Sequence, residues 1–214
     1  MIYLLLILIV AASYLWGCFS TARIVAKSFR FINIHKVGNG LADTENIYTH
    51  VSHTLGILVA ALDILKALVF LLLVEGLLRL LDAQGVWPGL DLLYNRSLML
   101  VYGLAMLIGH CLPATHQFKG GRGIFTYTGF LLYIAPLPML VSVLAAWLIV
   151  LRWKQIRFAQ YVIVILPVLL THVFYTFIPM FRRELPRYFV ALIWGIAILM
   201  GALNYLVSKK HGEL

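Results

Sequence analysis

The sequence predicts an all-α integral membrane protein with about seven transmembrane helices. Of its 214 residues, 63% are apolar and only 12% are charged, whereas about a quarter of the residues in a soluble domain are charged. The apolar residues gather in runs close to the roughly 20 residues that a helix needs to cross about 30 Å of hydrocarbon. Most lysines and arginines lie between these runs, where lipid headgroups and topology explain the net charge of +9. We therefore expect contact with membrane lipid and no binding of nucleic acid.

Dividing the chain by this length gives seven spans. They cover residues 2–22, 54–74, 97–114, 123–136, 138–151, 158–179 and 188–208. The first has no basic residues before its apolar run and is too long for the core of a signal peptide, so we interpret it as a retained helix. The second, third, sixth and seventh are each close to the required length. The uncharged stretch from Gly123 to Leu151 is too long for one span, and Pro136 and Pro138 divide it into two short helices. Because the chain has no internal repeat or flexible linker, we expect residues 1–214 to form a single domain.

The distribution of cations predicts that the N-terminus lies outside and the C-terminus in the cytoplasm. With this orientation the inside connections hold eleven lysines and arginines and the outside connections hold five, while Lys66 lies within a span. Cytoplasmic loops of membrane proteins carry such an excess of cations. Arg182 and Arg183 fall on the outside and oppose the trend.

Several polar residues lie within or beside the spans. Asp63 and Lys66 are three residues apart and share a helix face. Charges at this depth point to a bundle interior or a polar cavity, so the pair either fixes helix packing or shapes a polar site. His110 ends the third span, where a histidine is either a packing partner or a functional group. His50 and His53 have no third ligand at useful spacing, and we expect no metal site.

Residues 119–123, "KGGRG", form a segment that we call the glycine segment. Glycines let successive backbone N–H groups point into one concavity, and the flanking Lys119 and Arg122 add charge-assisted donors for phosphate oxygens. The start of the fourth span adds the positive end of a helix dipole. The pattern predicts a phosphate site, and the alternative is a basic loop at the membrane surface. In both cases we expect the two cations to be solvated and to contribute little to stability.

The glycine segment lies in a longer stretch that resembles a family signature. "GHCLPATHQFKGGRGIFTYTG", residues 109–129, is similar to G-H-x-F-P, a short spacer and F-K-G-G-K-G-V-A-T-x-x-G of the bacterial acyl-phosphate:glycerol-3-phosphate acyltransferases, the PlsY family. The ten matching residues are Gly109, His110, Pro113, Phe118, Lys119, Gly120, Gly121, Gly123, Thr126 and Gly129. "GCFSTARIVAK" and "LDILKAL" resemble two more family motifs, and Asn204 and Glu213 keep the nine-residue interval of a C-terminal signature. The chain is thus identified as a divergent member of the family.

Another family signature, G-S-G-N-x-G-A-T-N-x-x-R, agrees poorly with "GNGLADTENIYT", residues 38–49, which we call the first signature loop. Gly38, Gly40 and Asn46 stand where the family has them. The family's serine, asparagine, third glycine, threonine and arginine are replaced by Asn39, Leu41, Asp43, Glu45 and Thr49. The loop has lost a cation and gained two acids, so we expect glycerol 3-phosphate to be a poor acceptor and a hydroxyl compound without phosphate to be better. The alternative is that the acids point into water.

The resemblance implies that an acyl phosphate donates its acyl chain to a hydroxyl acceptor, glycerol 3-phosphate or a changed one, in the bacterial inner membrane. It implies no acyl-CoA, no cofactor and no bound metal. The residues that it assigns to catalysis are His110, Lys119 and Arg122. Those that it assigns to substrate binding are Gly38, Asn39, Gly40, Asn46, Gly120, Gly121, Gly123, Asn204 and Glu213. Two alternatives remain open from the sequence, a non-catalytic family member that binds lipid or a protein partner, and a small transporter or unrelated helical bundle.

Overall fold

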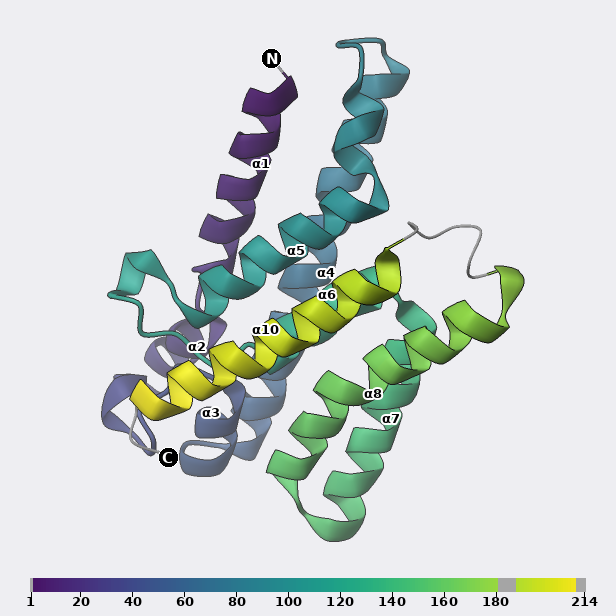
Figure 1. Cartoon of the computed structure of the whole chain (residues 1–214). Helices are drawn as coiled ribbons and strands as arrows, with labels where there is room; N and C mark the ends of the chain where they lie inside the picture. Colours follow the sequence, from purple (N-terminus) through teal and green to yellow (C-terminus); the bar gives the residue numbers. More distant parts are fainter. Residues whose placement is uncertain (1, 181–187, 211–214) are drawn as a thin grey trace.

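The computed structural model describes residues 2–180 and 188–210, and every regular element in these ranges is a helix (Figure 1). The α-helices are α1 (Ile2–Gly17), α2 (Thr21–Arg30), α3 (Thr44–His50), α4 (His53–Ala83), α5 (Arg96–Cys111), α6 (Ile124–Ile134), α7 (Pro136–Trp153), α8 (Ile156–Phe177) and α10 (Phe189–Lys210). Short 3-10 helices occur at η1 (Ile34–Lys36), η2 (Leu90–Tyr94) and η3 (Ala114–His116). In the described ranges, six helical segments are long and apolar enough to cross a membrane, and α6 is a shorter apolar helix. The all-α membrane class is therefore confirmed, while the sidedness stays a prediction.

The first predicted span, residues 2–22, is interrupted in the structure. Helix α1 ends at Gly17, and α2 begins at Thr21. The break is stabilised by Ser20, whose side chain accepts a hydrogen bond from the Arg23 backbone N–H at 3.4 Å. A serine in this position satisfies one of the N–H groups that a helix start leaves without a partner. The apolar run therefore holds one membrane helix and the start of a second helix.

The second predicted span is too short, because α4 continues to Ala83 instead of ending at residue 74. Glu75 and Arg79, two charged residues beyond the predicted span, lie one turn apart and form an ion pair at 2.7 Å. Pairing at this spacing supports a helix. Leu80 and Leu81 follow, and Asp82 near the end of the helix accepts a hydrogen bond from the Tyr94 hydroxyl at 2.7 Å.

The division of the long uncharged stretch near Pro136 is correct. Helix α6 ends at Ile134, and α7 begins at Pro136 after a single connecting residue. Proline is tolerated in the first turn of a helix because its missing N–H would have had no partner there. The two helices span 124–134 and 136–153 rather than 123–136 and 138–151.

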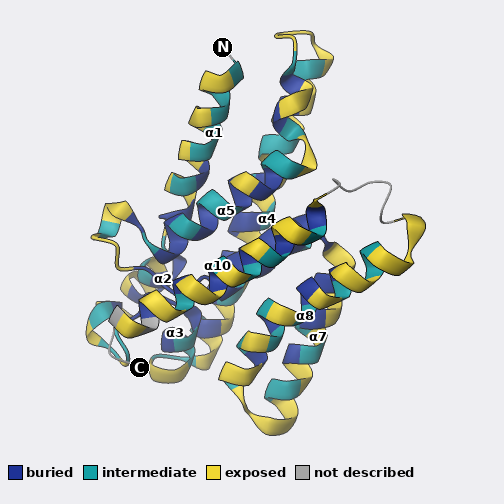
Figure 2. Ribbon diagram, viewed as in Figure 1, coloured by how far each residue is buried: buried dark blue, intermediate teal, exposed yellow. Residues whose placement is uncertain are grey.

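Helix α6 lies in the middle of the bundle. The helices pack in pairs, α1 on α5, α4 on α6 and α7 on α8, and α10 crosses both α8 and α5. Nine of the eleven residues of α6 are buried, whereas the outer helices bury one face and expose the other (Figure 2). Gly129 allows close packing, because a Cβ there would collide with the Ile64 carbonyl of α4. Enclosure by other helices explains how a helix too short to span the bilayer is accommodated.

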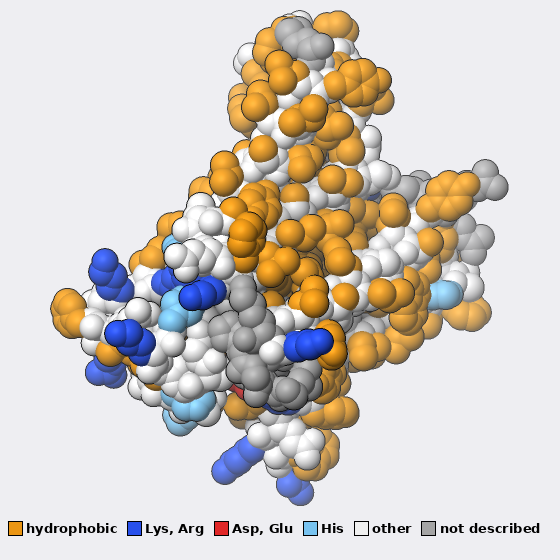
Figure 3. Space-filling model, turned by 60° about the vertical axis from the view of Figure 1, so that its left-hand side comes forward, with side chains coloured by type: hydrophobic (Ala, Val, Ile, Leu, Met, Phe, Trp, Pro, Cys, Tyr) orange, Lys and Arg blue, Asp and Glu red, His pale blue; other side chains and the backbone are white. Residues whose placement is uncertain are grey.

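The two ends of the molecule differ in polarity. In Figure 3, lysine and arginine side chains gather at one end, and hydrophobic side chains cover most of the remaining surface. Helices α2 and α3 lie at this end, as does the C-terminal part of α10 (Figure 1). The apolar surface is suited to lipid, and we call the opposite, cation-rich end the polar end.

Candidate functional site

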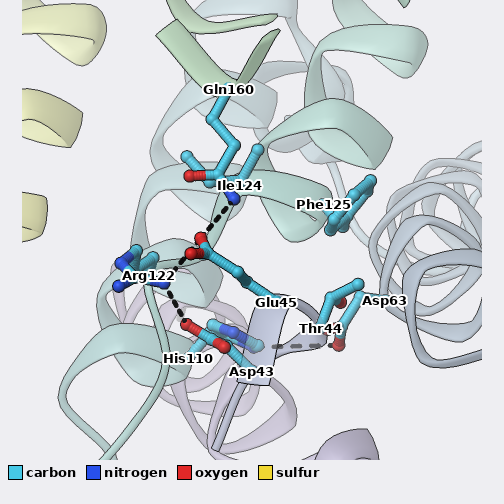
Figure 4. A pocket seen from close by; sticks show the side chains of 10 residues that line it. Asp43, Thr44, Glu45, Asp63, His110, Arg122, Ile124, Phe125 and Gln160 are labelled. Carbon is cyan, nitrogen blue, oxygen red and sulfur yellow. Dashed lines mark hydrogen bonds and ion pairs between the residues drawn. The ribbon is translucent and has the colours of Figure 1, made fainter. Parts of the chain in front are cut away.

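A pocket lies near the polar end, where segments distant in sequence meet (Figure 4). It is lined by Asp43, Thr44, Glu45, Asp63, His110, Arg122, Gly123, Ile124, Phe125 and Gln160. These residues come from the start of α3, the first half of α4, the end of α5, the start of α6 and the first turns of α8. The pocket therefore joins the first signature loop to the glycine segment.

The first signature loop is folded around the side chain of Asn46. The Asn46 amide donates hydrogen bonds to three backbone carbonyls within residues 34–41, at 2.8 to 3.5 Å. Gly38 has a φ of +56°, and a Cβ there would collide with the side chains of Asn46 and His50. The Asp43 carboxylate caps α3 by accepting the Asn46 backbone N–H at 2.9 Å. These contacts fix how the start of α3 faces the pocket.

The glycine segment lies directly against this loop. A Cβ on Gly121 would stand 2.8 Å from the Ala42 carbonyl oxygen, so a larger residue would separate the two chains. From α10, the Asn204 amide donates to the Arg122 carbonyl oxygen at 3.1 Å. Gly123, with a φ of +76°, starts α6 without a side-chain cap. The first N–H groups of α6 therefore lie at the pocket wall, with the positive end of the helix dipole.

Arg122 is buried between two carboxylates, contrary to the solvated arginine expected from the sequence. Its side chain is only 5% exposed, and Nη1 lies 3.2 Å from Asp43 Oδ2 and 2.9 Å from Glu45 Oε2. Glu45 also accepts a hydrogen bond from Gln160 Nε2 at 2.8 Å, and Arg157 Nε lies 3.5 Å from its other oxygen. Both acids of the first signature loop therefore point towards Arg122, as Figure 4 shows, and not into water.

A second polar cluster lies beside the pocket, inside the bundle. Lys66 Nζ lies 2.9 Å from Asp63 Oδ1 and 2.9 Å from His110 Nδ1, and it donates to the Phe19 carbonyl at 2.9 Å. Thr21 donates its hydroxyl to Asp63 Oδ1 at 2.7 Å. Asp63 and Lys66 form the ion pair that one interpretation predicted, and Asp63 also lines the pocket, as the other interpretation predicted.

The same contacts assign the tautomer of His110. The ammonium group of Lys66 only donates hydrogen bonds, so Nδ1 accepts and the proton of the neutral ring is on Nε2. An added Cβ on Gly121 would lie 3.1 Å from Nε2, which places this N–H beside the glycine segment. His110 therefore presents a donor to that segment.

The predicted site residues take different places in the structure. His110, Arg122 and Gly123 line the pocket, while Gly120 and Gly121 are buried behind its wall and Lys119 is exposed. Gly38, Asn39, Gly40 and Asn46 belong to the loop that supports α3, and Asn204 contacts the backbone of the glycine segment from α10. Glu213 lies outside the described residues, as do Arg182 and Arg183. Thr49, which replaces the family's arginine, is exposed on α3 and is not among the residues that line the pocket.

Sequence reasoning missed three contributors to the site. Gln160 carries no local signal, because its partner Glu45 is 115 residues away along the chain. Thr21 lies in the stretch "GCFSTARIVAK", but its partner Asp63 is 42 residues away along the chain. The link between Lys66 and His110 joins two spans and needs the fold. In the described ranges, no three His, Cys, Asp or Glu side chains are grouped so that they could hold a metal ion.

Comparison with known proteins places these residues in context. The family model described as "Glycerol-3-phosphate acyltransferase" matches residues 7–211. A glycerol-3-phosphate acyltransferase from Chlorobium phaeobacteroides is 34% identical over 140 residues, which are 65% of this chain and 58% of that protein. One from Chlorobaculum tepidum is 32% identical over 135 residues, which are 63% of this chain and 56% of that protein. The chain therefore matches less than two thirds of the length of these curated relatives.

Two solved structures share the fold. They are crystal structures of PlsY (YgiH), an integral membrane glycerol 3-phosphate acyltransferase, in the glycerol 3-phosphate form and in the lysophosphatidic acid form. The TM-scores are 0.70 and 0.68, the sequence identities are 23% and 22%, and each match covers 97% of this chain and 90% of the other.

Proposed function

This chain belongs to the glycerol-3-phosphate acyltransferase family, and from that premise we propose that its pocket transfers an acyl chain from an acyl phosphate to a hydroxyl acceptor. The observation that carries the proposal is the meeting of the family's signatures at one pocket. The first signature loop supplies Asp43 and Glu45, the glycine segment supplies Arg122, and the end of α5 supplies His110. The pocket is lined by the start of α3, which lies at the polar end, and the apolar helices beyond it suit an acyl chain in lipid.

The reaction needs positioning more than it needs strong chemical activation. The acceptor oxygen attacks the acyl carbonyl carbon, and the bond from that carbon to the phosphate oxygen breaks. The products are an acyl ester and inorganic phosphate, and the phosphate carries away the hydroxyl proton. Because phosphate is a good leaving group, the protein has to hold it, stabilise its charge and aim the hydroxyl.

The groups that suit the leaving phosphate lie along the glycine segment. Lys119 is exposed at the end of this segment that is remote from α6, and the segment leads into the uncapped start of α6. A lysine ammonium group and a helix N-terminus both stabilise phosphate oxygens. We assign Lys119 and these backbone N–H groups to the donor phosphate.

His110 acts in this proposal as a hydrogen-bond donor and not as a general base. Its Nδ1 accepts from Lys66 at 2.9 Å, and its Nε2 carries the proton. A donor beside the glycine segment can stabilise charge that develops on the acyl carbonyl or the phosphate. The hydroxyl proton then leaves with the phosphate.

The test is an assay of the purified full chain in lipid nanodiscs with palmitoyl phosphate as donor. Inorganic phosphate release is measured with a panel of hydroxyl acceptors and with none, and the lipid product is identified by mass spectrometry. We expect acceptor-dependent release that Lys119→Ala abolishes and that Arg30→Ala, which removes an exposed cation of α2 outside the family motifs, leaves unchanged. Release that no acceptor increases would contradict the proposal.

A second candidate function follows from the contacts of Arg122. Because two carboxylates already hold this cation, the chain is also suited to be a non-catalytic family member that binds lipid. Mass spectrometry of lipids that co-purify with the protein tests this candidate, which predicts a bound lipid together with no phosphate release from any donor and acceptor pair.

A further inference from the structure

We infer that the acceptor enters this pocket without a phosphate group, because the carboxylate of Glu45 occupies the place where a phosphate would find its donors. The inference rests on the proposed acyl transfer and specifies its acceptor as an uncharged hydroxyl compound, of which glycerol is the simplest probe. It follows from the contacts of one acid, from the charge balance of the pocket, and from the number of phosphates that the reaction has to accommodate.

The Glu45 carboxylate is bound as a ligand anion would be. One oxygen accepts from Arg122 Nη1 at 2.9 Å and from Gln160 Nε2 at 2.8 Å, and the other lies 3.5 Å from Arg157 Nε. These donors come from the glycine segment and from α8, and Figure 4 shows Arg122 and Gln160 on different sides of Glu45. Guanidinium and amide N–H groups arranged around a carboxylate are also the donors that bind phosphate.

The carboxylates of Asp43 and Glu45 are held by several contacts, so they do not move aside easily for a ligand. Asp43 caps α3 through one oxygen and contacts Arg122 through the other. The carboxylate of Glu45 is 15% exposed and that of Asp43 is 8% exposed, so water screens little of their charge. A phosphate that entered here would meet two anions at close range and would have to break the ion pairs of Arg122 with Asp43 and Glu45.

Among the described residues that line the pocket or pair with its acids, three carboxylates face three cations. The carboxylates of Asp43, Glu45 and Asp63 face the cations of Arg122, Arg157 and Lys66. With His110 neutral, this set of described residues has no net charge. Adding the two negative charges of a phosphate monoester would leave the pocket uncompensated, whereas an uncharged hydroxyl compound preserves the balance.

The reaction of glycerol 3-phosphate with an acyl phosphate brings two phosphates to one site. The glycine segment carries two cations, and Arg122 is held by two acids. Among the described residues no carboxylate forms an ion pair with Lys119, which leaves this lysine for the donor phosphate. Lys119 and the helix start serve one phosphate, whereas Arg122, the cation among the described residues that line the pocket, is already bound by two carboxylates.

The test compares the unmodified chain with the double variant Asp43→Asn, Glu45→Gln. Both changes remove charge and keep shape, and asparagine retains the cap of α3. Glu75→Gln, which removes an acid of α4 away from the pocket, is the matched control. With palmitoyl phosphate as donor, the unmodified chain and the control should acylate glycerol faster than glycerol 3-phosphate. The double variant should shift this preference towards glycerol 3-phosphate by about tenfold or more.

A binding measurement without donor separates this inference from the proposed function. We expect millimolar glycerol 3-phosphate to leave the melting temperature of the unmodified chain unchanged and to raise that of the double variant. If the double variant does not fold, the single variant Glu45→Gln is used in its place, because it keeps the ion pair between Asp43 and Arg122. Stabilisation of the unmodified chain by glycerol 3-phosphate as strong as that of the variant would overturn the inference. So would faster acylation of glycerol 3-phosphate than of glycerol by the unmodified chain. If no acceptor is acylated in the assay, the result counts against the proposed transfer. The binding measurement would then still show whether Asp43 and Glu45 exclude glycerol 3-phosphate from the pocket.

Discussion

Arg122 of the glycine segment contacts both the first signature loop and α10. Its guanidinium group binds Asp43 and Glu45 of the first signature loop, and its backbone carbonyl accepts from Asn204 of α10. The neighbouring Lys119 shares the same segment and yet is exposed. Two cations that look equivalent in the sequence therefore differ in the structure, because Arg122 is buried in ion pairs and Lys119 is exposed.

This difference gives a stability prediction. Arg122→Ala should lower the free energy of unfolding by about 3–5 kcal/mol, because it removes the buried cation that two poorly exposed carboxylates share. Lys119→Ala should change it by less than about 0.5 kcal/mol, as expected for an exposed side chain without an ion pair among the described residues. Thermal or denaturant unfolding in detergent measures both values. Equal, small effects of the two changes would show that Arg122 is solvated after all.

His110 gives a second prediction at the scale of the residue. If Nε2–H acts as a donor, His110→Gln keeps an amide N–H near the same place and should retain activity to within about tenfold, whereas His110→Ala should lose more. A general base would instead contribute about 10²–10⁴-fold, and both variants would lose it. Initial rates of phosphate release at several pH values distinguish the two roles. Two results together would show that His110 is a general base. They are a rate that falls when His110 of the unmodified protein is protonated, and a glutamine variant that is inactive.

The packing of the glycine segment against the first signature loop is a property of whole elements. Gly121→Ala places a Cβ 2.8 Å from the Ala42 carbonyl oxygen and should push the two segments apart. We expect loss of most of the transfer activity while the apolar helices stay folded. Gly195→Ala in α10 is the matched control, because a Cβ there has no atom of other residues within 4 Å. This control should be stable or slightly stabilised, since alanine favours a helix by about 0.5–1 kcal/mol over glycine. Circular dichroism and the transfer assay together report both effects, and an active Gly121→Ala variant would mean that the close approach is unnecessary.

Elements also show where sequence reasoning stops. The hydrophobic runs predicted α5, α8 and α10 closely, because lipid imposes the length of a helix that spans it, and the prolines predicted the division between α6 and α7. The interruption after Gly17 depends on one serine cap, and the extension of α4 depends on the pairing of Glu75 with Arg79. Both are local contacts that a hydropathy criterion does not register.

The candidate site was predictable in part for a related reason. His110 and Arg122 lie in a stretch whose composition already indicated phosphate chemistry, and the structure places both at the pocket. The acids of the first signature loop were recognised as a departure from the family pattern. That they bind Arg122 could not be read from the sequence, because the partners are 79 and 77 residues apart and meet only after the bundle has formed.

At the scale of the whole molecule, the gathering of cations at one end agrees with the predicted orientation. Cysteine labelling tests that orientation. Gln117 has a φ of +55°, which cysteine would strain, so the exposed Thr115 is the better position. In a background where Cys18 and Cys111 are alanine, Thr115→Cys should be protected from an impermeant thiol reagent in intact cells. Gln84→Cys, in the exposed connection after α4, should react. The reverse pattern would invert the topology.

The contact between Asn204 and the Arg122 carbonyl also affects how the protein is made. A membrane protein is synthesised from its N-terminus, so α10 is the last of the described helices to leave the ribosome. Until α10 docks, the backbone of the glycine segment lacks the hydrogen bond from Asn204. The earlier helices can insert while the site is still incomplete. A chain released before α10 is synthesised would therefore reach the membrane without a fully assembled pocket.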